Sequence, residues 1–588
     1  MALARRHWGA LAVVTSFVVS RLALANIAGL RFDNRPLNDA AQLLDRGQLR
    51  DNLVESLLNL HAQPPLFNLF VGLGLRAPSE LETPLFHAFY LAVGLGIALC
   101  LYAVLRRAGV ATSWAVVCTV LFSWSPGVFL YESWLHYDHL VVLLLVLSVV
   151  ALQRYAAERR PSHAALFACA LGAVVLTRSL FHLAWLLAAV ALLVVMATGD
   201  RRRVLAAVSI PVLIVVGFHF QRLGAFGTFA LSSSLGGSLA RITVFQLPEA
   251  LRETMVDEGR LSAVSLVEPF SPLASYDGLV PVPPRTGVPV LDEPEKAAYE
   301  NPPTNEVFDM NHNSLAYLAI SQSYLHDAVQ VIRTHPGVYV AGVQTAIELF
   351  FRPTSDFFTL AENRARVAPI EWLYNKALLG VVAGGRGEAV IPGSEDNYRL
   401  GPARTAWTVV ASYVLAVAGG AVFLLRSLIR RPSGGQRGVV VVVGFLWFTT
   451  VYVFLVSNLI EVGENNRFRL YSDPLVLMLL ATLIMEWRRG RARRLALHDD
   501  GPKAGDGATS ANGAEVGDAR VSSEGKTSPA PGGSSPESRC SEPASTESSA
   551  TPRPAEGSRT SGSPPPPHQG AAASAPSPAG TRDGSPPT

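Results

Sequence analysis

The stretch Leu85–Leu105 reads LFHAFYLAVGLGIALCLYAVL and contains no Asp, Glu, Lys or Arg. An α-helix needs about 20 apolar residues to cross the hydrocarbon core of a bilayer. The stretch therefore predicts a membrane-spanning helix. Arg106 and Arg107 follow it directly, and basic residues beside a span are typical of its cytoplasmic end.

Further apolar blocks lie on both sides of this stretch. They cover about residues 8–30, 112–131, 138–153, 163–177, 181–198, 203–219, 405–426, 438–458 and 473–487. Several are short for a span and would have to tilt or thin the bilayer. Residues 339–351 are a candidate for an additional helix that dips into the membrane. The pattern predicts an all-α polytopic membrane protein with about 10–12 transmembrane helices.

Composition excludes several other classes of protein. Of the 588 residues, 49% are hydrophobic and 16% are charged, whereas soluble domains carry roughly 25% charged residues. The mean hydropathy is +0.28 despite a long polar tail. These values exclude a soluble globular enzyme and a wholly disordered chain. The cysteines provide neither a disulfide framework nor a zinc spacing; they are Cys100, Cys118, Cys169 and Cys540.

The positions of the arginines predict the orientation of the spans. Every second loop is rich in Arg, near residues 5–6, 106–107, 154–160, 201–203, 426–437 and 488–494. The opposite loops are long or acidic and cover residues 31–84, 131–138, 221–404 and 457–473. The positive-inside rule then places both termini in the cytoplasm, in a multi-pass protein of the cell (inner or plasma) membrane.

The chain divides into four parts on this scheme. They are an N-terminal transmembrane module with the first outer loop at 1–219, a large extracytoplasmic loop region at 220–404, C-terminal transmembrane helices at 405–490 and a disordered cytoplasmic tail at 491–588. The tail consists mainly of Ser, Pro, Gly, Ala and charged residues, which cannot pack a core. No internal repeat is visible in the sequence, so the inverted-repeat signature of secondary transporters is missing.

The first outer loop carries acidic residues beside the end of the first span. Asp33 lies just past that span, and Asp39 and Asp45 follow. A carboxylate that is part-shielded from water at this interface could serve as a general base near neutral pH. Alternatively, Asp33 pairs with Arg31 or Arg35 and anchors the loop.

An amphipathic segment follows these acids. In Leu43–Leu60, leucines lie on one side of a helix and charged residues on the other. This spacing predicts an interfacial helix that lies on the outer leaflet. A packed helix in a soluble lid would produce the same spacing, so both readings stay open.

The short loop Tyr131–His139 is crowded with titratable and aromatic residues. The aromatic residues fit a belt at the membrane interface. A short turn has no need of Glu132, Asp138 and two histidines, however. Asp138 and His139 could bind a divalent metal or a phosphate-bearing head group. The spacing is too loose to assign a metal site.

Three arginines lie in outer loops, where positive charge is otherwise scarce. Arg178 lies at a turn between two spans, and Arg467 and Arg469 follow Glu464 and Asn466 in the last outer loop. A guanidinium group suits a phosphate or pyrophosphate through bidentate hydrogen bonds, and it could stabilise a leaving phosphate. Snorkelling of Arg178 to the interface and hydration of the last loop are the alternatives.

In this order, the fragments resemble the GT-C superfamily of membrane glycosyltransferases, and within it the bacterial dolichyl-phosphate-mannose-protein mannosyltransferase-like group. In such enzymes an acid follows the first span, an interfacial helix comes next, a Pro-Pro-Leu-aromatic segment enters the second span and a second acid opens the fourth. The matching segments are Asp33, Leu43–Leu60, His61–Phe67 and Asp138, with Leu176–Arg178 and Asn466–Arg469 similar to later segments. The resemblance covers about residues 1–490.

The resemblance implies a GT-C-like fold and transfer of a sugar from a polyprenyl-phosphate donor, a membrane lipid, to a hydroxyl of a glycan, lipid or protein acceptor, with inversion. It implies a catalytic acid among Asp33, Asp39 and Asp45, of which Asp33 is preferred for its place beside the membrane. It implies donor or phosphate contacts from Asp138, His139, Arg178, Arg467 and Arg469, and substrate contacts from His61, Gln63, Glu132, Glu464 and Asn466. A divalent metal is compatible with these residues but not required by them. Neither a nucleotide nor a nucleic acid is expected, since no Gly-rich phosphate loop is visible.

Two other functions compete with this one. A transporter or flippase would place charged residues at mid-span positions, whereas here the polar groups concentrate in outer loops. An envelope polysaccharide polymerase or ligase would also use lipid-linked sugars and long outer loops, and the length of its product would distinguish it.

Overall fold

The computed structural model describes residues 2–197, 199–296, 310–383, 389–390, 399–400, 404–430 and 434–499. The chain separates into two compact units, Met1–Lys503 and Ala504–Thr588. The second unit lies outside the described residues, and with it almost all of the tail that is predicted to be disordered. Residues 491–499 belong to a helix instead, which corrects the predicted start of the tail at 491.

Helices make up about three quarters of the described residues. The helices with the length and apolar composition of a membrane span are α1 (Ala2–Asn26), α6 (Ser79–Ala108), α9 (Asp138–Glu158), α12 (Arg201–Phe226), α20 (Trp407–Arg430), α21 (Gly434–Ile460) and α22 (Asn465–Asp499). The shorter apolar helices are α5 (Pro65–Gly74), α10 (Pro161–Thr177) and α11 (Leu183–Met196). Helices α7 (Thr112–Ser123) and α8 (Pro126–Glu132) meet at a bend of 60°. The protein is therefore an all-α polytopic chain in the part described.

The described part has fewer helices of spanning length than the 10–12 predicted spans. Each of the ten predicted apolar blocks contains a helix, but seven helices of that part have spanning length and composition, or eight if α7 and α8 form one span. Helices α10 and α11 have only 17 and 14 residues, fewer than the ~20 that a straight span requires. The break before Pro126 has a local cause, because proline at the first position of a helix starts a new helix and cannot continue the previous one.

The remaining elements lie mainly in the predicted outer loops. The helices are α2 (Pro36–Asp39), α3 (Arg46–Asp51), α4 (Leu53–Leu58), α13 (Leu235–Ile242), α14 (Glu249–Asp257), α15 (Pro289–Asp292), α16 (Ala316–Thr334), α17 (Pro336–Phe350), α18 (Ala361–Arg366) and α19 (Ala368–Ala377). Short 3₁₀ turns are η1 (Val244–Gln246), η2 (Ala263–Leu266), η3 (Leu273–Tyr276) and η5 (Phe358–Leu360). Two antiparallel strand pairs join β1 (Val381–Ala383) to β4 (Arg404–Ala406) and β2 (Ala389–Val390) to β3 (Arg399–Leu400).

The segment Leu43–Leu60 is not one helix. It forms α3 and α4, which are separated at Asn52. Leu49 and Leu53 are buried, and these helices pack against α5, whereas Leu58 is exposed. Most of the leucine face is thus covered by protein, which favours the packed alternative over a helix with its whole apolar face in the lipid.

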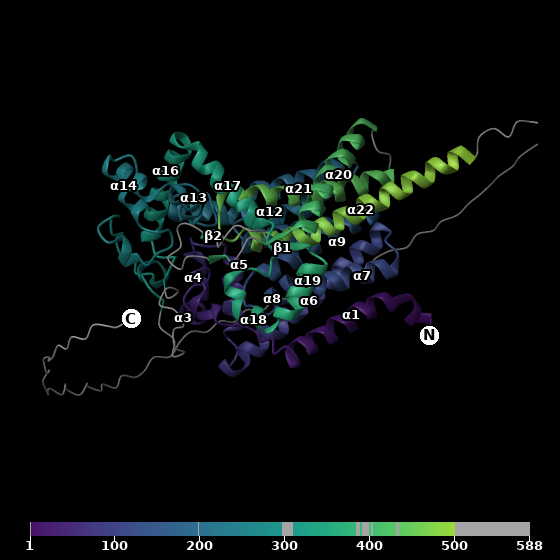
Figure 1. The fold of residues 1–588 in the computed structure, drawn as a ribbon, viewed down its shortest axis with the longest axis horizontal. Helices are drawn as coiled ribbons and strands as arrows, with labels where there is room; N and C mark the ends of the chain where they lie inside the picture. Colours follow the sequence, from purple (N-terminus) through teal and green to yellow (C-terminus); the bar gives the residue numbers. More distant parts are fainter. Residues whose placement is uncertain are drawn as a thin grey trace, which may run out of the picture. The chain divides into compact units, whose positions relative to one another are not determined.

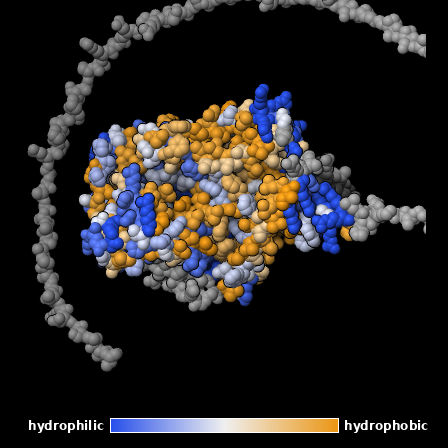
Figure 2. Space-filling model, turned by 90° about the horizontal axis from the view of Figure 1, so that it is seen from above, coloured by the Kyte–Doolittle hydropathy of each residue, from blue (hydrophilic) through white to orange (hydrophobic). Residues whose placement is uncertain are grey.

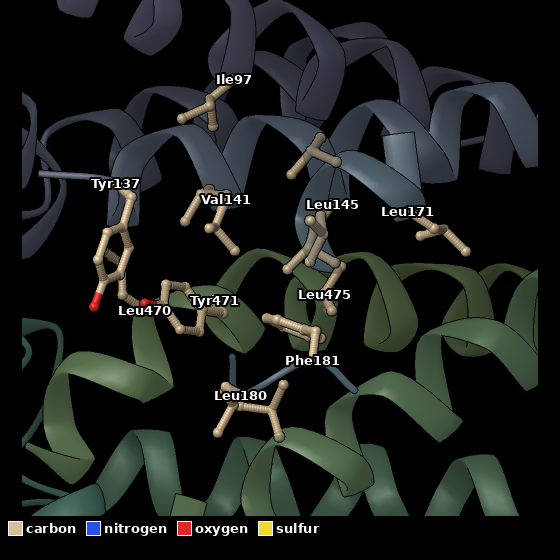
Figure 3. Packing of buried hydrophobic residues seen from close by; sticks show 14 of the residues in the cluster. Ile97, Tyr137, Val141, Leu145, Leu171, Leu180, Phe181, Leu470, Tyr471 and Leu475 are labelled. Carbon is tan, nitrogen blue, oxygen red and sulfur yellow. The ribbon is translucent and has the colours of Figure 1, made fainter. Parts of the chain in front are cut away.

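Helix α9 lies at the centre of the main core. It packs against α6, α10, α21 and α22. Figure 3 shows Val141 and Leu145 of α9 facing Tyr471 and Leu475 of α22. A helix that is apolar on all sides belongs in the interior of a helical bundle, and α9 has that composition. Its N-terminal turn therefore lies where several other helices end.

The Arg-rich loops gather at one end of the described unit. Arg489 near the end of α22 donates to the Ala108 carbonyl at the end of α6, over 2.9 Å. Arg159 donates to the Met196 carbonyl at the end of α11. Figure 1 shows α13, α14 and α16 grouped at the end of this unit opposite to the free ends of α1 and α22. The visible face between the two ends is largely apolar, and hydrophilic residues concentrate at the ends (Figure 2).

Candidate functional site

The first outer loop is fixed to the second by backbone hydrogen bonds. The Asp33 N–H donates to the Ser133 carbonyl over 2.7 Å, and the Leu135 N–H donates to the Asp33 carbonyl over 2.9 Å. These bonds form a parallel bridge between Asp33 and Trp134. As a result, Asp33 lies beside the segment that leads into α9.

A cavity of about 590 Å³ opens next to this bridge. Its walls come from the two bridged loops, the turn after α10, the loop before α22 and the region from 233 to 324. Of the residues expected at the site, five line it: Asp33, Gln63, Arg178, Glu464 and Arg467. Volumes of about 300–1,000 Å³ are usual for small-molecule sites.

Arg178 and Arg467 come from distant parts of the chain but share partners at the cavity wall. The Arg467 Nη2 atom is 2.6 Å from a Glu464 carboxylate oxygen and 3.4 Å from the Tyr137 hydroxyl. Arg178 also donates to the Tyr137 hydroxyl, and its Nη2 atom is 4.0 Å from the same Glu464 oxygen. The rings of Tyr137 and Phe468 lie against both guanidinium groups.

Both guanidinium groups retain an unused donor. The Nε atoms of Arg178 and Arg467 are buried, and neither has a hydrogen-bond partner in the part of the chain that the structure describes. The Arg467 side chain is only 2% exposed. A buried guanidinium with spare donors favours an anion with several oxygens. Glu464 now bridges the two groups, in the position that such an anion would take.

Asp138 lies behind the cavity wall and is fully buried. Its Oδ2 atom is 2.7 Å from His136 Nδ1 and 3.9 Å from Arg467 Nε, and its Oδ1 atom accepts the Tyr471 hydroxyl. Asp138 is not among the residues that line the cavity, whereas His136 is. Asp138, which was expected to contact the donor, thus contacts His136, and His136 lines the cavity.

His136 is one of the two histidines noted in the loop Tyr131–His139, but it was not among the residues expected at the site. Its ring stacks on Trp134, with centroids 4.1 Å apart and planes 7° from parallel. Burial lowers the pKa of His136 to about 4, although the Asp138 carboxylate opposes that shift. The imidazole is therefore neutral at pH 7. A His two residues before an acid at the start of a span is the signal that could have identified it.

The carboxylate of Asp33 is occupied by Arg35. The Arg35 Nε and Nη2 atoms lie 2.9 and 2.6 Å from the two carboxylate oxygens, and the Arg35 backbone N–H also donates to Asp33. The pairing expected in the loop-anchoring alternative is thus present, although Asp33 also lines the cavity. Asp45 instead caps α3 by accepting from the Gln48 N–H. The Asp39 side chain lies outside the described side chains.

Three other expected residues bind within the fold. Arg469 donates to the Phe350 carbonyl over 2.7 Å and pairs with Asp473. Asn466 donates to the carbonyls of Pro353 and Asp356. His61 does not line the cavity: its Nδ1 atom is 2.9 Å from the Ser233 hydroxyl, and its backbone N–H donates to Asn313. These contacts hold the segments around the cavity in place.

Glu132 and His139 form a separate buried cluster with α1. Glu132 makes a bidentate pair with Arg21 at 2.8 Å, and His139 Nε2 is 3.8 Å from the same carboxylate. The cluster requires Gly94, because a Cβ atom there would collide with the Glu132 carboxylate. Neither Glu132 nor His139 lines the cavity, so the structure does not bring them to the other expected site residues.

Replacement of Glu132 by Ala is expected to destabilise the protein without affecting ligand binding in the cavity. Breaking a buried ion pair leaves an uncompensated charge, here on Arg21, at a cost of about 3–5 kcal/mol. Thermal unfolding in detergent would measure the loss, with Glu80→Ala, an exposed acid on α6, as the control. An unchanged midpoint for Glu132→Ala would contradict the structural role of this pair.

Another part of the wall comes from the region between α12 and α17. Serines and aromatic side chains predominate in it, and its Arg241 pairs with Glu461 of the loop before α22, at 3.6 Å. Burial raises the pKa of Glu461 above its ordinary value, although Arg241 opposes the shift. Hydroxyl groups beside aromatic rings suit a polar organic ligand.

The described residues contain no group of three or more His, Cys, Asp or Glu side chains that could hold a metal ion. No family model, curated protein or solved structure matches the chain. The chemistry of the cavity therefore rests on its own side chains, among them the carboxylates of Asp33 and Glu464, the neutral imidazole of His136 and the buried guanidinium groups of Arg178 and Arg467.

Proposed function

We propose that this protein is a membrane glycosyltransferase with a GT-C-like arrangement, which transfers a sugar from a polyprenyl-phosphate donor to an acceptor hydroxyl. The observation that carries the proposal is the convergence of Asp33, His136, Arg178 and Arg467 on one cavity beside apolar helices of spanning length. The reaction takes place at the extracytoplasmic face, with both termini in the cytoplasm. The Arg-rich loops at the opposite end of the helices support this orientation.

The two arginines bind the donor phosphate in this proposal. As the bond between the sugar and the phosphate breaks, negative charge grows on the phosphate oxygens. Arg178 and Arg467 are buried, already oriented by aromatic rings and supplied with free donors. Preorganised donors of this kind stabilise a developing charge more strongly than water does. The polyprenyl chain would remain in the bilayer among the apolar helices.

The carboxylate of Asp33 and the serine and aromatic part of the wall act on the sugar and the acceptor. The anomeric carbon gains positive charge as the phosphate leaves, and a nearby carboxylate stabilises that charge. The acceptor hydroxyl enters from the serine and aromatic wall and attacks the face opposite the phosphate. A single displacement of this kind inverts the anomeric configuration.

Glu464 competes with the phosphate for the two guanidinium groups. Replacement of Glu464 by Gln removes one negative charge from between them, so polyprenyl phosphate is expected to bind about three- to tenfold more tightly. Isothermal titration of the nanodisc-embedded protein with a short polyprenyl phosphate would measure the change. Glu362→Gln, at an exposed lining acid, is the matched control. Weaker binding by Glu464→Gln would contradict this arrangement.

The direct test of the function uses the full chain in nanodiscs with polyprenyl-phosphate hexoses that are radiolabelled in the sugar. Membrane extract of a deletion strain supplies the acceptor. The expected result is label that leaves the lipid phase in a covalent product, together with free polyprenyl phosphate. Movement of intact labelled lipid across the bilayer without any product would instead support a flippase. A ladder of long products would support a polymerase.

A further inference from the structure

The imidazole of His136 has an unused nitrogen in a residue of the cavity wall. Its Nε2 atom is buried and has no hydrogen-bond partner in the described part of the chain, and His136 lines the cavity. Buried polar atoms in native proteins are nearly always hydrogen-bonded, so an orphaned atom of a lining residue points to a ligand contact. Stacking on Trp134 and the close ring of Tyr137 prevent His136 from rotating away.

Asp138 determines which nitrogen of that ring carries the proton. The ionised carboxylate can only accept, and its Oδ2 atom is 2.7 Å from Nδ1. Nδ1 is therefore the protonated nitrogen, and Nε2 holds an unused lone pair. Asp138 is itself held by the Tyr471 hydroxyl and by the charge of Arg467. A buried carboxylate that orients an imidazole is the arrangement that makes histidine an effective base.

Asp33 is less suited to take a proton in this structure. Both of its carboxylate oxygens accept hydrogen bonds from Arg35, so a proton acceptor there would first have to break an ion pair. A carboxylate held in that way can act electrostatically. The contacts of Asp33 therefore permit an electrostatic role, whereas those of His136 permit it to accept a proton.

On the basis of the proposed function, we infer that His136 Nε2, rather than Asp33, accepts the proton of the attacking hydroxyl, and that Asp138 is a positioning residue for His136. The acceptor oxygen forms its bond to the anomeric carbon while the bond from that carbon to the phosphate oxygen breaks. The hydroxyl proton moves to Nε2, and the bonding electron pair leaves with the polyprenyl phosphate. The imidazolium that results is stabilised by Asp138.

The groups that face this imidazole define its response to pH. They are Asp138 on the next helix, Tyr137 beside it, and Arg178 and Arg467 on two other elements. Protonation of Nε2 before reaction removes the acceptor, so kcat/KM is expected to fall as the pH falls toward about 4. A bound anionic donor favours the imidazolium, so the corresponding fall in kcat lies at higher pH.

The decisive experiment is a double-mutant cycle on sugar transfer by the full chain in nanodiscs. His136→Gln and Asp138→Asn are each expected to lower kcat by about 10²–10⁴-fold, and the double variant is expected to be no slower than His136→Gln alone, because two residues that act as one unit are not additive. His136→Gln should also lose the acidic limb of the pH profile and bind polyprenyl phosphate within about threefold of the wild type. His163→Gln, from another histidine–acid pair, is the control.

Three outcomes would overturn the inference. The first is multiplicative loss in the double variant, and the second is an acidic limb that survives in His136→Gln but disappears in Asp33→Asn. The third applies if the other variants do not fold. It is the failure of added imidazole to restore transfer to a folded His136→Gly protein under conditions in which the wild type is active. If the wild type transfers sugar from no polyprenyl-phosphate hexose, the proposed function itself has failed, and the inference falls with it.

Discussion

Replacement of Arg178 by Gln is expected to lower the rate of sugar transfer by about 10²–10³-fold, the usual cost of removing one preorganised donor to a developing negative charge. Arg178 shares Tyr137 and Glu464 with Arg467, so the double replacement with Arg467→Gln should cost more than either single change but less than their product. Initial rates with a labelled polyprenyl-phosphate hexose would measure both effects.

The control for the arginines is Arg160→Gln, an exposed side chain on the Arg-rich side of the helices. It removes the same charge without touching the cavity, and it should leave transfer within about twofold of wild type. Thermal unfolding of each variant distinguishes a loss of transfer activity from a loss of folded protein. Normal transfer by a folded Arg178→Gln protein would contradict the proposal that the donor phosphate binds in this part of the cavity.

Replacement of Asp33 by Asn is expected to reduce transfer by a similar factor of about 10²–10³ while the protein stays folded in the membrane. The amide keeps the size of the side chain and the backbone bridge to Trp134 but removes the negative charge that faces the sugar. Because that charge acts electrostatically, the pH profile of the remaining activity should keep its acidic limb. Rates between about pH 4 and 8 would show both features.

Two matched variants distinguish chemistry from loop anchoring at Asp33. Asp45→Asn alters another acid of the same loop, one that caps α3, and should affect stability by no more than about 1 kcal/mol. Arg35→Gln breaks the same ion pair from the other side and leaves the carboxylate in place. Loss of transfer in Arg35→Gln as large as in Asp33→Asn would mean that the pair only anchors the loop.

The helical architecture could be predicted because a span is a long apolar run of residues, whether it faces lipid or is buried in the protein. Apolar runs such as Leu85–Leu105 are helical in the structure, and so is the segment 339–351 up to Phe350, where α17 ends. The described part has fewer helices of spanning length than the predicted number of spans, since composition cannot show where a helix ends. Helices α10 and α11 stop early, and Pro126 divides one apolar block.

The site was harder to predict than the fold, for geometrical reasons. Successive residues of an α-helix are 100° apart, so Arg467 and Arg469 point to nearly opposite sides of α22, and only Arg467 lines the cavity. The same rotation separates Asp138, which turns to His136, from His139, which turns to Glu132. A linear motif contains all of these residues without showing which of them face a common space.

The bridge between the first and second outer loops also governs how the site is assembled during synthesis. Asp33 leaves the ribosome long before Ser133 and Leu135, the residues that hold its backbone. The N-terminal hairpin is therefore made before the cavity wall is complete, and the carboxylate reaches its final place only after α8 has been made. Arg178 follows with the end of α10, and Arg467 completes the wall last, since α22 is the last helix of the described chain to be synthesised.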